Sequence, residues 1–190
     1  MESEYLKGLN VLIEYKNLIS EMNCPSGMYV VPSEDLFLWH GTLFIHRGYY
    51  KEGVFKFEVS LKNYPTECPT VKFKSSIFHP LIDPIDNMLY LGKFENKWSN
   101  QFYISHILHY IKDIFKSQMI QDINELYCPH LEALKIFKGE KQRFIQLANQ
   151  SAVKSNLEDE LFKKDFIQFK NLSDGEYANL KLKMNQYMNK

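Results

Sequence analysis

The residue best suited to acid–base chemistry in this chain is His79, which stands in the run Phe78-His79-Pro80-Leu81. An imidazole changes its charge near neutral pH and acts as a general base when a nucleophile lies within hydrogen-bond reach. The sequence places no such nucleophile near His79, and no cysteine occurs between Pro69 and Tyr127. A histidine before a proline also holds a loop extended by hydrogen bonds to the backbone. We therefore expect His79 to be structural.

The other residues able to react or to bind a metal are scattered. Cys24, Cys68 and Cys128 form no CxxC pair, so the sequence indicates neither a zinc site nor a disulfide framework. We expect each of them to be a buried or neutral thiol. His106 and His109 stand three residues apart, but the sequence offers no obvious third ligand. Phosphate-loop and dinucleotide-binding patterns are absent from the sequence, so we expect no metal and no cofactor.

Composition limits the classes of function. The 190 residues carry 23 Lys and Arg and 23 Asp and Glu, which lacks the basic excess typical of nucleic-acid-binding proteins. A hydrophobic content of 45% suits a packed globular domain. The polar N-terminus is unlike a secretory signal, and no apolar run reaches the length of a membrane span. We expect a cytoplasmic protein with protein partners, no nucleic acid and no direct membrane insertion.

Four short segments bounded by turn residues are predicted to be strands. They cover 28–31, 36–45, 54–61 and 70–74. The third alternates strictly between apolar and polar residues, so one of its faces should be buried. Tight turns between the segments favour an antiparallel four-stranded meander, and the helices on either side of it place the chain in the α+β class.

Helical periodicity marks the other elements. The first helix, 4–21, has a stripe that we expect to be buried. The residues of this stripe are Tyr5, Leu9, Leu12, Ile13, Lys16 and Ile19. The segment 104–115 has the most apolar stripe of the chain and should be the central helix packed on the sheet. Two further helices are predicted around 131–134 and 144–153, with a break near Gly139.

This order of elements, with the Phe-His-Pro loop between the sheet and the central helix, resembles the fold of the ubiquitin-conjugating enzymes. The Tyr64-Pro65 turn, the strand start at Gly53 and Trp98-Ser99 before the central helix all look like family motifs. Each motif alone is a modest signal, and their order makes the resemblance specific. It implies a ubiquitin-conjugating-like core domain over 5–152 and a helical C-terminal extension over 153–190.

The resemblance also implies that the chemistry of the family is missing. In active members an asparagine follows Phe-His-Pro, and a cysteine on the next short apolar run carries ubiquitin as a thioester. Here Leu81 stands at the asparagine position, and with Leu89 kept buried Tyr90 stands at or beside the cysteine position. A phenol with a pKa of about 10 is a poor nucleophile at neutral pH, and Leu81 has no hydrogen bond to donate. We predict that His79, Leu81, Leu89 and Tyr90 form a degenerate site away from Cys68, and that the chain is not an enzyme.

Within the family the chain resembles the inactive subgroup of fused toes, also called AKT-interacting protein. The run from His79 to Pro84 carries this likeness, because leucine and Asp-Pro after His-Pro are absent from active enzymes. The resemblance implies an interaction subunit of a cytosolic complex with a coiled-coil Hook-type adaptor, acting in vesicle transport. The alternative is a ubiquitin-handling protein, either a cofactor variant that binds ubiquitin noncovalently or an atypical conjugating enzyme.

The last predicted helix offers a surface for such a partner. Ser173 and Glu176 form a capping-box pattern at its start. Beyond them an apolar stripe lies on one side of the helix, formed by Tyr177, Leu180, Met184 and Tyr187. Tyrosine and methionine are enriched in interface cores, so this stripe is a candidate partner-binding surface. The stripe can equally dock on its own domain, as in most amphipathic helices.

Overall fold

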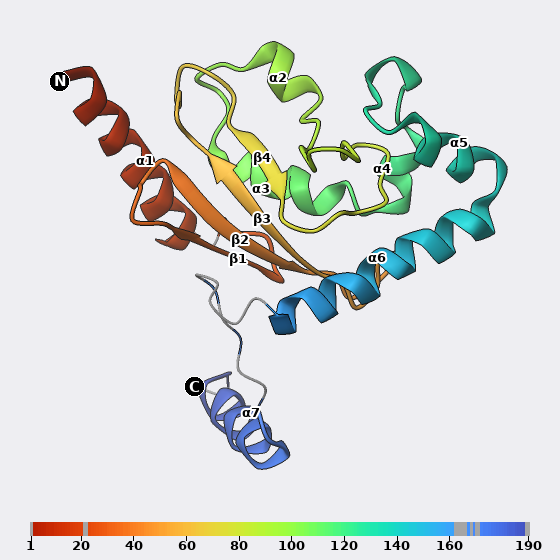
Figure 1. Cartoon of the computed structure of the whole chain (residues 1–190). Coiled ribbons are helices and arrows are strands. Elements are labelled where there is room, and N and C mark those ends of the chain that lie inside the picture. The colour runs from red at the N-terminus through yellow and green to blue at the C-terminus, as the bar shows by residue number, and fades with distance from the viewer. Residues whose placement is uncertain (1, 21–22, 162–166, 168, 170–171, 189–190) are drawn as a thin grey trace.

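A computed structural model describes residues 2–20, 23–161, 167, 169 and 172–188 and shows an α+β fold built on a four-stranded sheet (Figure 1). The strands are β1 (Met28–Pro32), β2 (Leu38–Phe44), β3 (Val54–Ser60) and β4 (Thr70–Phe73). Neighbouring strands pair antiparallel in sequence order. The predicted meander is therefore confirmed, with β2, β3 and β4 one to three residues shorter than expected.

Helices precede and follow the sheet. They are α1 (Glu2–Ser20), α2 (Lys93–Lys97), α3 (Ile104–Asp113), α4 (Ser117–Gln121), the 3-10 helix η1 (Glu125–Tyr127), α5 (Leu131–Gly139), α6 (Lys141–Leu161) and α7 (Asp174–Met188). The central helix and the two helices predicted after it are confirmed. The sequence pattern does not predict α2, α4 and η1, because elements of three to five residues are too short to show a helical period. The predicted domain boundary between 152 and 153 falls inside α6, and the division into core and extension remains a prediction.

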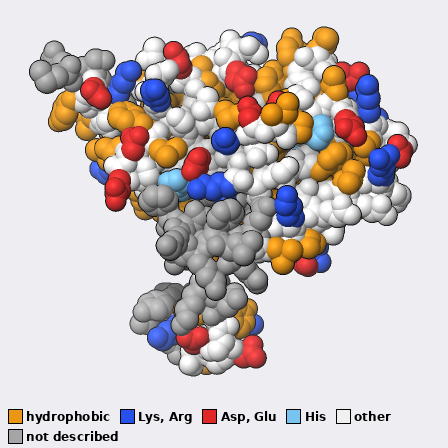
Figure 2. All heavy atoms as spheres, in the orientation of Figure 1, with side chains coloured by type: hydrophobic (Ala, Val, Ile, Leu, Met, Phe, Trp, Pro, Cys, Tyr) orange, Lys and Arg blue, Asp and Glu red, His pale blue; other side chains and the backbone are white. Residues whose placement is uncertain are grey.

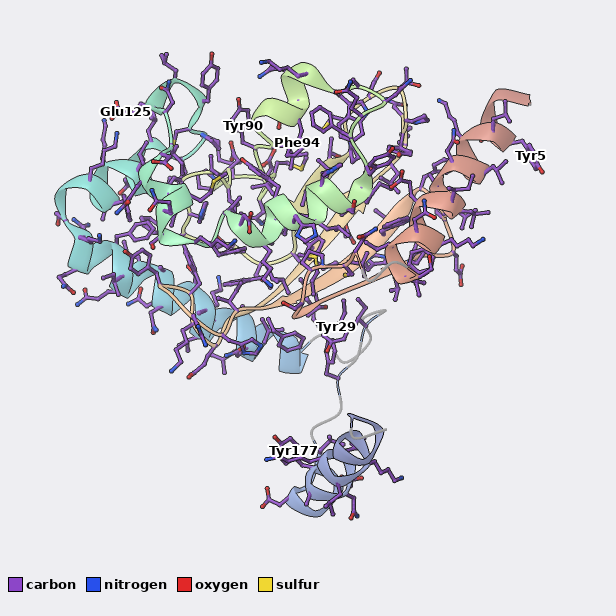
Figure 3. All side chains as sticks on the ribbon, turned by 180° about the vertical axis from the view of Figure 1, so that it is seen from behind. Tyr5, Tyr29, Tyr90, Phe94, Glu125 and Tyr177 are labelled. Carbon is purple, nitrogen blue, oxygen red and sulfur yellow. The ribbon has the colours of Figure 1, made fainter. Side chains whose placement is uncertain are left out.

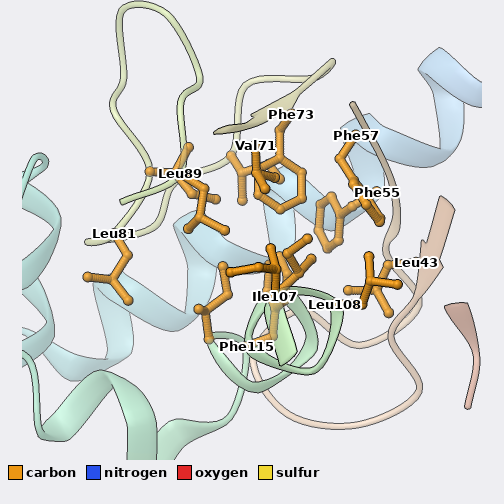
Figure 4. Packing of buried hydrophobic residues seen from close by; sticks show 14 of the residues in the cluster. Leu43, Phe55, Phe57, Val71, Phe73, Leu81, Leu89, Ile107, Leu108 and Phe115 are labelled. Atoms are coloured by element: carbon orange, nitrogen blue, oxygen red, sulfur yellow. The ribbon is translucent and has the colours of Figure 1, made fainter. Parts of the chain in front are cut away.

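The core lies between the sheet and α3. Ile107, Leu108 and Ile111 of α3 are fully buried, as their spacing predicts. They face the aromatic side chains of β3 and β4, and Phe115 stacks on Phe55 with 5.0 Å between the ring centroids (Figure 4). The apolar face predicted from strand alternation and the apolar stripe predicted from helical periodicity thus face each other, which gives one continuous core.

Gly41 lets an aromatic ring close this core. The register of β2 and β3 pairs Gly41 with Phe57, and the Phe57 ring lies directly over the glycine. A Cβ atom at residue 41 would overlap that ring. The position therefore requires glycine for close approach and not for backbone freedom.

The buried face of α1 differs from the predicted one. Val11 and Leu18 are buried, whereas the apolar residues of the predicted stripe are exposed by 43–73%. A polar contact fixes this rotation, because the Glu14 carboxylate accepts from the Tyr64 hydroxyl at 2.8 Å and from the backbone N–H of Ile104 at 3.1 Å. The helix has two apolar faces, and periodicity alone selected the wrong one.

Two described residues beyond α6, Ile167 and Phe169, lie against the outer face of the sheet. Near the middle of that face, Ile167 lines a small hollow with Thr42 and Lys56, both of which are buried. At its edge Phe169 packs edge-on against Tyr29 and Phe44, with centroid distances of 5.2 and 4.8 Å. Among the described residues no helix is both long and apolar enough to cross a membrane.

Candidate functional site

His79 lies at the centre of the candidate site and is fully buried. Its Nε2 lies 2.9 Å from the carbonyl oxygen of Ile114, and its Nδ1 accepts from the backbone N–H of Leu81 at 3.0 Å. A neutral imidazole with its proton on Nε2 satisfies both contacts. Burial lowers the pKa of His79 to about 4, which favours this neutral form. Because the Nδ1 lone pair is already used by the Leu81 amide, the geometry fits a structural histidine better than a general base.

The segment around Tyr90 is held on both sides by backbone contacts. The Tyr90 N–H donates to the carbonyl of Leu81 at 2.9 Å, and the Tyr110 hydroxyl donates to the Tyr90 carbonyl at 3.2 Å. Leu81, Leu89 and Leu91 are buried around it. Tyr90 is half-buried between buried Leu89 and Leu91, so its side chain is partly accessible, and its equivalence to the cysteine position remains a prediction.

The Tyr90 side chain opens onto a groove of about 740 Å3 between α2, α3 and the segment of α4 and η1 (Figure 3). Its lining is mostly apolar and aromatic, with a few charged side chains among them. The residues that line it include Leu81, Tyr90, Phe94, His106, His109, Tyr110, Met119, Ile123 and Tyr127. Desolvation, followed by the charge of Glu95, raises the pKa of Tyr90, so the phenol stays protonated at neutral pH. The groove can bind, but its described lining offers no activated nucleophile.

Two of the three thiols, Cys68 and Cys128, contact this region. Cys68 lines a second hollow, of about 490 Å3, together with Leu89 and Tyr90, whereas it was predicted to lie away from the site. Desolvation and Glu95 raise the pKa of Cys68 to about 12. Cys128 is buried and donates to the carbonyl of Pro80 at 3.1 Å. Its thiol pKa and that of Cys24 are also raised, chiefly by burial, so all three are neutral thiols at physiological pH.

His106 and His109 both line the groove. His106 completes a capping box at the start of α3, since its Nδ1 accepts from the Tyr103 N–H at 2.9 Å. Throughout the described part of the chain no three histidine, cysteine or acidic side chains gather as metal ligands would. The pair therefore shapes one wall of the groove.

The predicted partner-binding stripe lies on α7, in the blue part of Figure 1. The capping box is confirmed, because the Ser173 N–H donates to the Glu176 carboxylate at 2.9 Å and the Glu176 N–H to the Ser173 hydroxyl at 3.4 Å. Tyr177 and Leu180 are exposed. The side chains of Met184 and Tyr187 lie outside the described residues, and the role of the stripe remains a prediction.

Several residues of the groove were not identified from the sequence. Tyr110 holds the Tyr90 carbonyl, and the ring of Tyr127 lies parallel to that of Tyr90 at 6.3 Å between centroids. Tyr110 lies one helical turn after His106 on α3, a spacing that could have indicated it. Tyr127 and Met119 reach the groove from short elements whose path the sequence pattern does not define.

Fold and site together define a domain of the ubiquitin-conjugating type. A family model described as ubiquitin-conjugating enzyme matches residues 11–152, which is most of the chain. The chain therefore belongs to the ubiquitin-conjugating enzyme family. The expected likeness to the fused toes and AKT-interacting protein subgroup is confirmed by the individual relatives.

Three relatives illustrate that likeness. The chain is 34% identical over 150 residues to a protein crossbronx homolog of Anopheles gambiae, which covers 76% of this chain and 65% of the relative. It is 43% identical over 114 residues to a crossbronx-like protein of Drosophila mojavensis, covering 57% and 44%. It is 34% identical over 146 residues to the AKT-interacting protein of Danio rerio, covering 74% and 49%. The chain thus spans about half to two thirds of the length of these relatives.

Proposed function

We propose that this chain is a non-catalytic member of the family. The observation that carries the proposal is the half-buried phenol of Tyr90 at the position where the resemblance expects the thioester cysteine. The hydrogen-bonding side chain expected after Phe-His-Pro is replaced by buried Leu81, so a developing oxyanion has no side-chain donor from that residue. Cys68 shares a hollow with Tyr90, and its raised pKa leaves almost no thiolate at neutral pH.

A thioester assay tests this proposal. The chain is incubated with activating enzyme, ATP and ubiquitin, beside an active conjugating enzyme as the positive control, and analysed on a non-reducing gel. We expect no adduct that disappears with reductant. A reductant-sensitive band would contradict the proposal, and repeating the assay with Cys68→Ser would show whether that thiol carries it. Tyr90→Cys should not restore transfer to lysine, because loss of one oxyanion donor costs about a hundredfold or more in rate.

We further propose that the chain acts in the cytoplasm as an interaction subunit of a Hook-type adaptor complex in vesicle transport. The support is its likeness to the AKT-interacting protein of Danio rerio, whose name denotes an interaction and no catalytic activity. A second support is α7, where Tyr177 and Leu180 expose apolar surface on the same side of the helix. Such a stripe fits the hydrophobic surface of a coiled-coil partner.

Co-purification of a tagged full-length chain with a coiled-coil Hook-type adaptor tests this role. Tyr177→Glu and Leu180→Glu should each weaken recovery of the partner, whereas Asn179→Glu, which adds the same charge on the opposite side of α7, should not. A chain truncated after Leu172 should lose the partner while its circular dichroism signal shows a folded core. Full recovery with all three substitutions would move the interface away from α7.

Ubiquitin titration separates this role from the ubiquitin-handling alternative. Isotope-labelled ubiquitin is mixed with the full-length chain, and its amide resonances are followed by NMR. We expect no concentration-dependent shifts. Saturable shifts would favour a noncovalent ubiquitin-binding cofactor over an adaptor subunit.

A further inference from the structure

An apolar strip on α1 is left uncovered by the described residues. It consists of Tyr5, Leu6, Leu9, Leu12 and Ile13, whose side chains are exposed by 43–73%. Hydrophobic side chains reach the surface along α1, and the labelled Tyr5 lies at the outer edge of the molecule (Figures 2 and 3). We call this set the α1 strip. Contiguous exposed apolar surface on one helix face marks an interaction site more often than scattered single residues do.

The strip cannot turn inward, because the opposite side of α1 is fixed to the domain. Val11 and Leu18 are buried there, Glu14 accepts two hydrogen bonds, and Tyr15 packs edge-on against Trp39 at 5.4 Å. Helical residues are spaced by about 100°, so a position two residues from Val11 lies about 160° around the helix from it. The strip therefore faces away from the domain, and a partner helix can approach it without meeting the sheet.

The order of residues in the strip is symmetric about Leu9. Tyr5 and Ile13 each lie four residues from Leu9, on its two sides, and Leu6 and Leu12 each lie three residues from it. An antiparallel pair of identical helices with its two-fold axis at Leu9 would place an apolar residue opposite an apolar residue in every layer. Such a self-complementary patch is what an isologous two-fold interface requires.

We propose that two copies of this chain associate through the α1 strip as an antiparallel helix pair centred on Leu9. The N-terminal half of α1 extends past the end of the sheet, which leaves room for a second copy (Figure 1). Large side chains carry on the order of 200 Å2 each, so five that are about half exposed offer on the order of 500 Å2 per chain. Two copies bury on the order of 1,000 Å2 in total, which is at the lower limit of specific interfaces. The dimer is therefore weak and concentration-dependent.

Sedimentation equilibrium of the full-length chain tests the association. From micromolar to near-millimolar concentration, the average mass should rise from 22.6 kDa toward twice that value. Leu9→Lys should raise the dissociation constant about tenfold for each copy, and hence about a hundredfold, because the two-fold axis brings both substitutions together. Asn17→Lys is the matched control, since it adds the same charge to an exposed position of α1 outside the strip. Equal dissociation constants for the two variants would overturn the proposal.

Site-directed cross-linking checks the geometry without disturbing the apolar surface by a charge. Leu9→Cys and Asn17→Cys are each treated with a short bismaleimide, beside the parent chain, which shows the background from Cys24, Cys68 and Cys128. Leu9→Cys should give a dimeric band several-fold above this background, and Asn17→Cys should not. A monomeric mass at all concentrations, or equal bands for both variants, would show that the strip is not a contact between copies and leave it to a helix of another protein.

Discussion

The buried imidazole of His79 predicts a specific loss of stability in mild acid. In the folded chain its pKa is lowered from 6.5 to about 4, first by desolvation and also by the nearby His130, against an opposing hydrogen bond to Ile114. Between these two values the unfolded chain binds more protons than the folded chain does. The free energy of unfolding is therefore highest at neutral pH and falls as the pH is lowered through this window.

The size of the effect follows from the same two values. A tenfold change in proton affinity corresponds to about 1.4 kcal/mol, so the full effect of His79 is about 3 kcal/mol at most, and about 2 kcal/mol is already lost at pH 5. Protonation of Nδ1 would also displace the Leu81 amide from its acceptor, which agrees with a loss of this size. Urea midpoints shift by about 1 M for such a change in a small domain.

Urea unfolding followed by the fluorescence of Trp39 and Trp98 measures this dependence at pH 7, 6 and 5. His79→Gln keeps a donor and an acceptor but does not titrate, so its midpoint should fall less between pH 7 and pH 5 than that of the parent. The half-exposed His130, whose pKa is lowered chiefly by desolvation, remains in both chains. His46→Gln, on the surface, is the matched substitution. Equal pH dependence in the parent and in His79→Gln would refute the reasoning.

Three further outcomes follow from buried contacts. Gly41→Ala should destabilise the fold by several kcal/mol, measured by urea unfolding, because the new methyl group would overlap the Phe57 ring. A urea midpoint within about 0.2 M of that of the parent chain would contradict this packing. Tyr50→Phe should cost about 1–3 kcal/mol in the same assay, since it removes the hydroxyl of a fully buried tyrosine that donates to the Phe78 carbonyl at 2.7 Å. Cys68 should react with iodoacetamide at pH 8 much more slowly than a free thiol, because its pKa is raised to about 12; mass spectrometry of the labelled peptide shows whether this holds.

The sheet and its central helix could be predicted because their apolar patterns define which faces are buried. Alternation in 54–61 fixes which side of β3 is buried, and the helix with the most apolar stripe is expected to cover that side. In α1 the pattern was ambiguous, since apolar residues occupy two faces. The carboxylate of Glu14 decides between them by accepting from Tyr64 and Ile104, which are 50 and 90 residues away in the chain. A contact of that range has no signature in local periodicity.

The candidate site was predicted in part for a similar reason. His79, Leu81, Leu89 and Tyr90 follow one another closely, so short-range order brings them together. Tyr127 and the thiol of Cys128 reach the same region only through the path of α4 and η1, which the sequence does not specify. Residues near the site in space were thus missed when their position depended on short elements without a period.

The contacts beyond residue 152 separate the extent of the family match from the extent of the folding unit. The match ends at residue 152. Ser155 nevertheless accepts from the Val54 N–H at 3.0 Å, and Asn156 donates to the Glu52 carbonyl at 2.8 Å. A fragment cut at the end of the match would leave the start of β3 without these partners and would remove Ile167 and Phe169 from the outer sheet face. Studies of isolated domains from this subgroup should therefore extend past the family match, at least to the residue corresponding to Phe169.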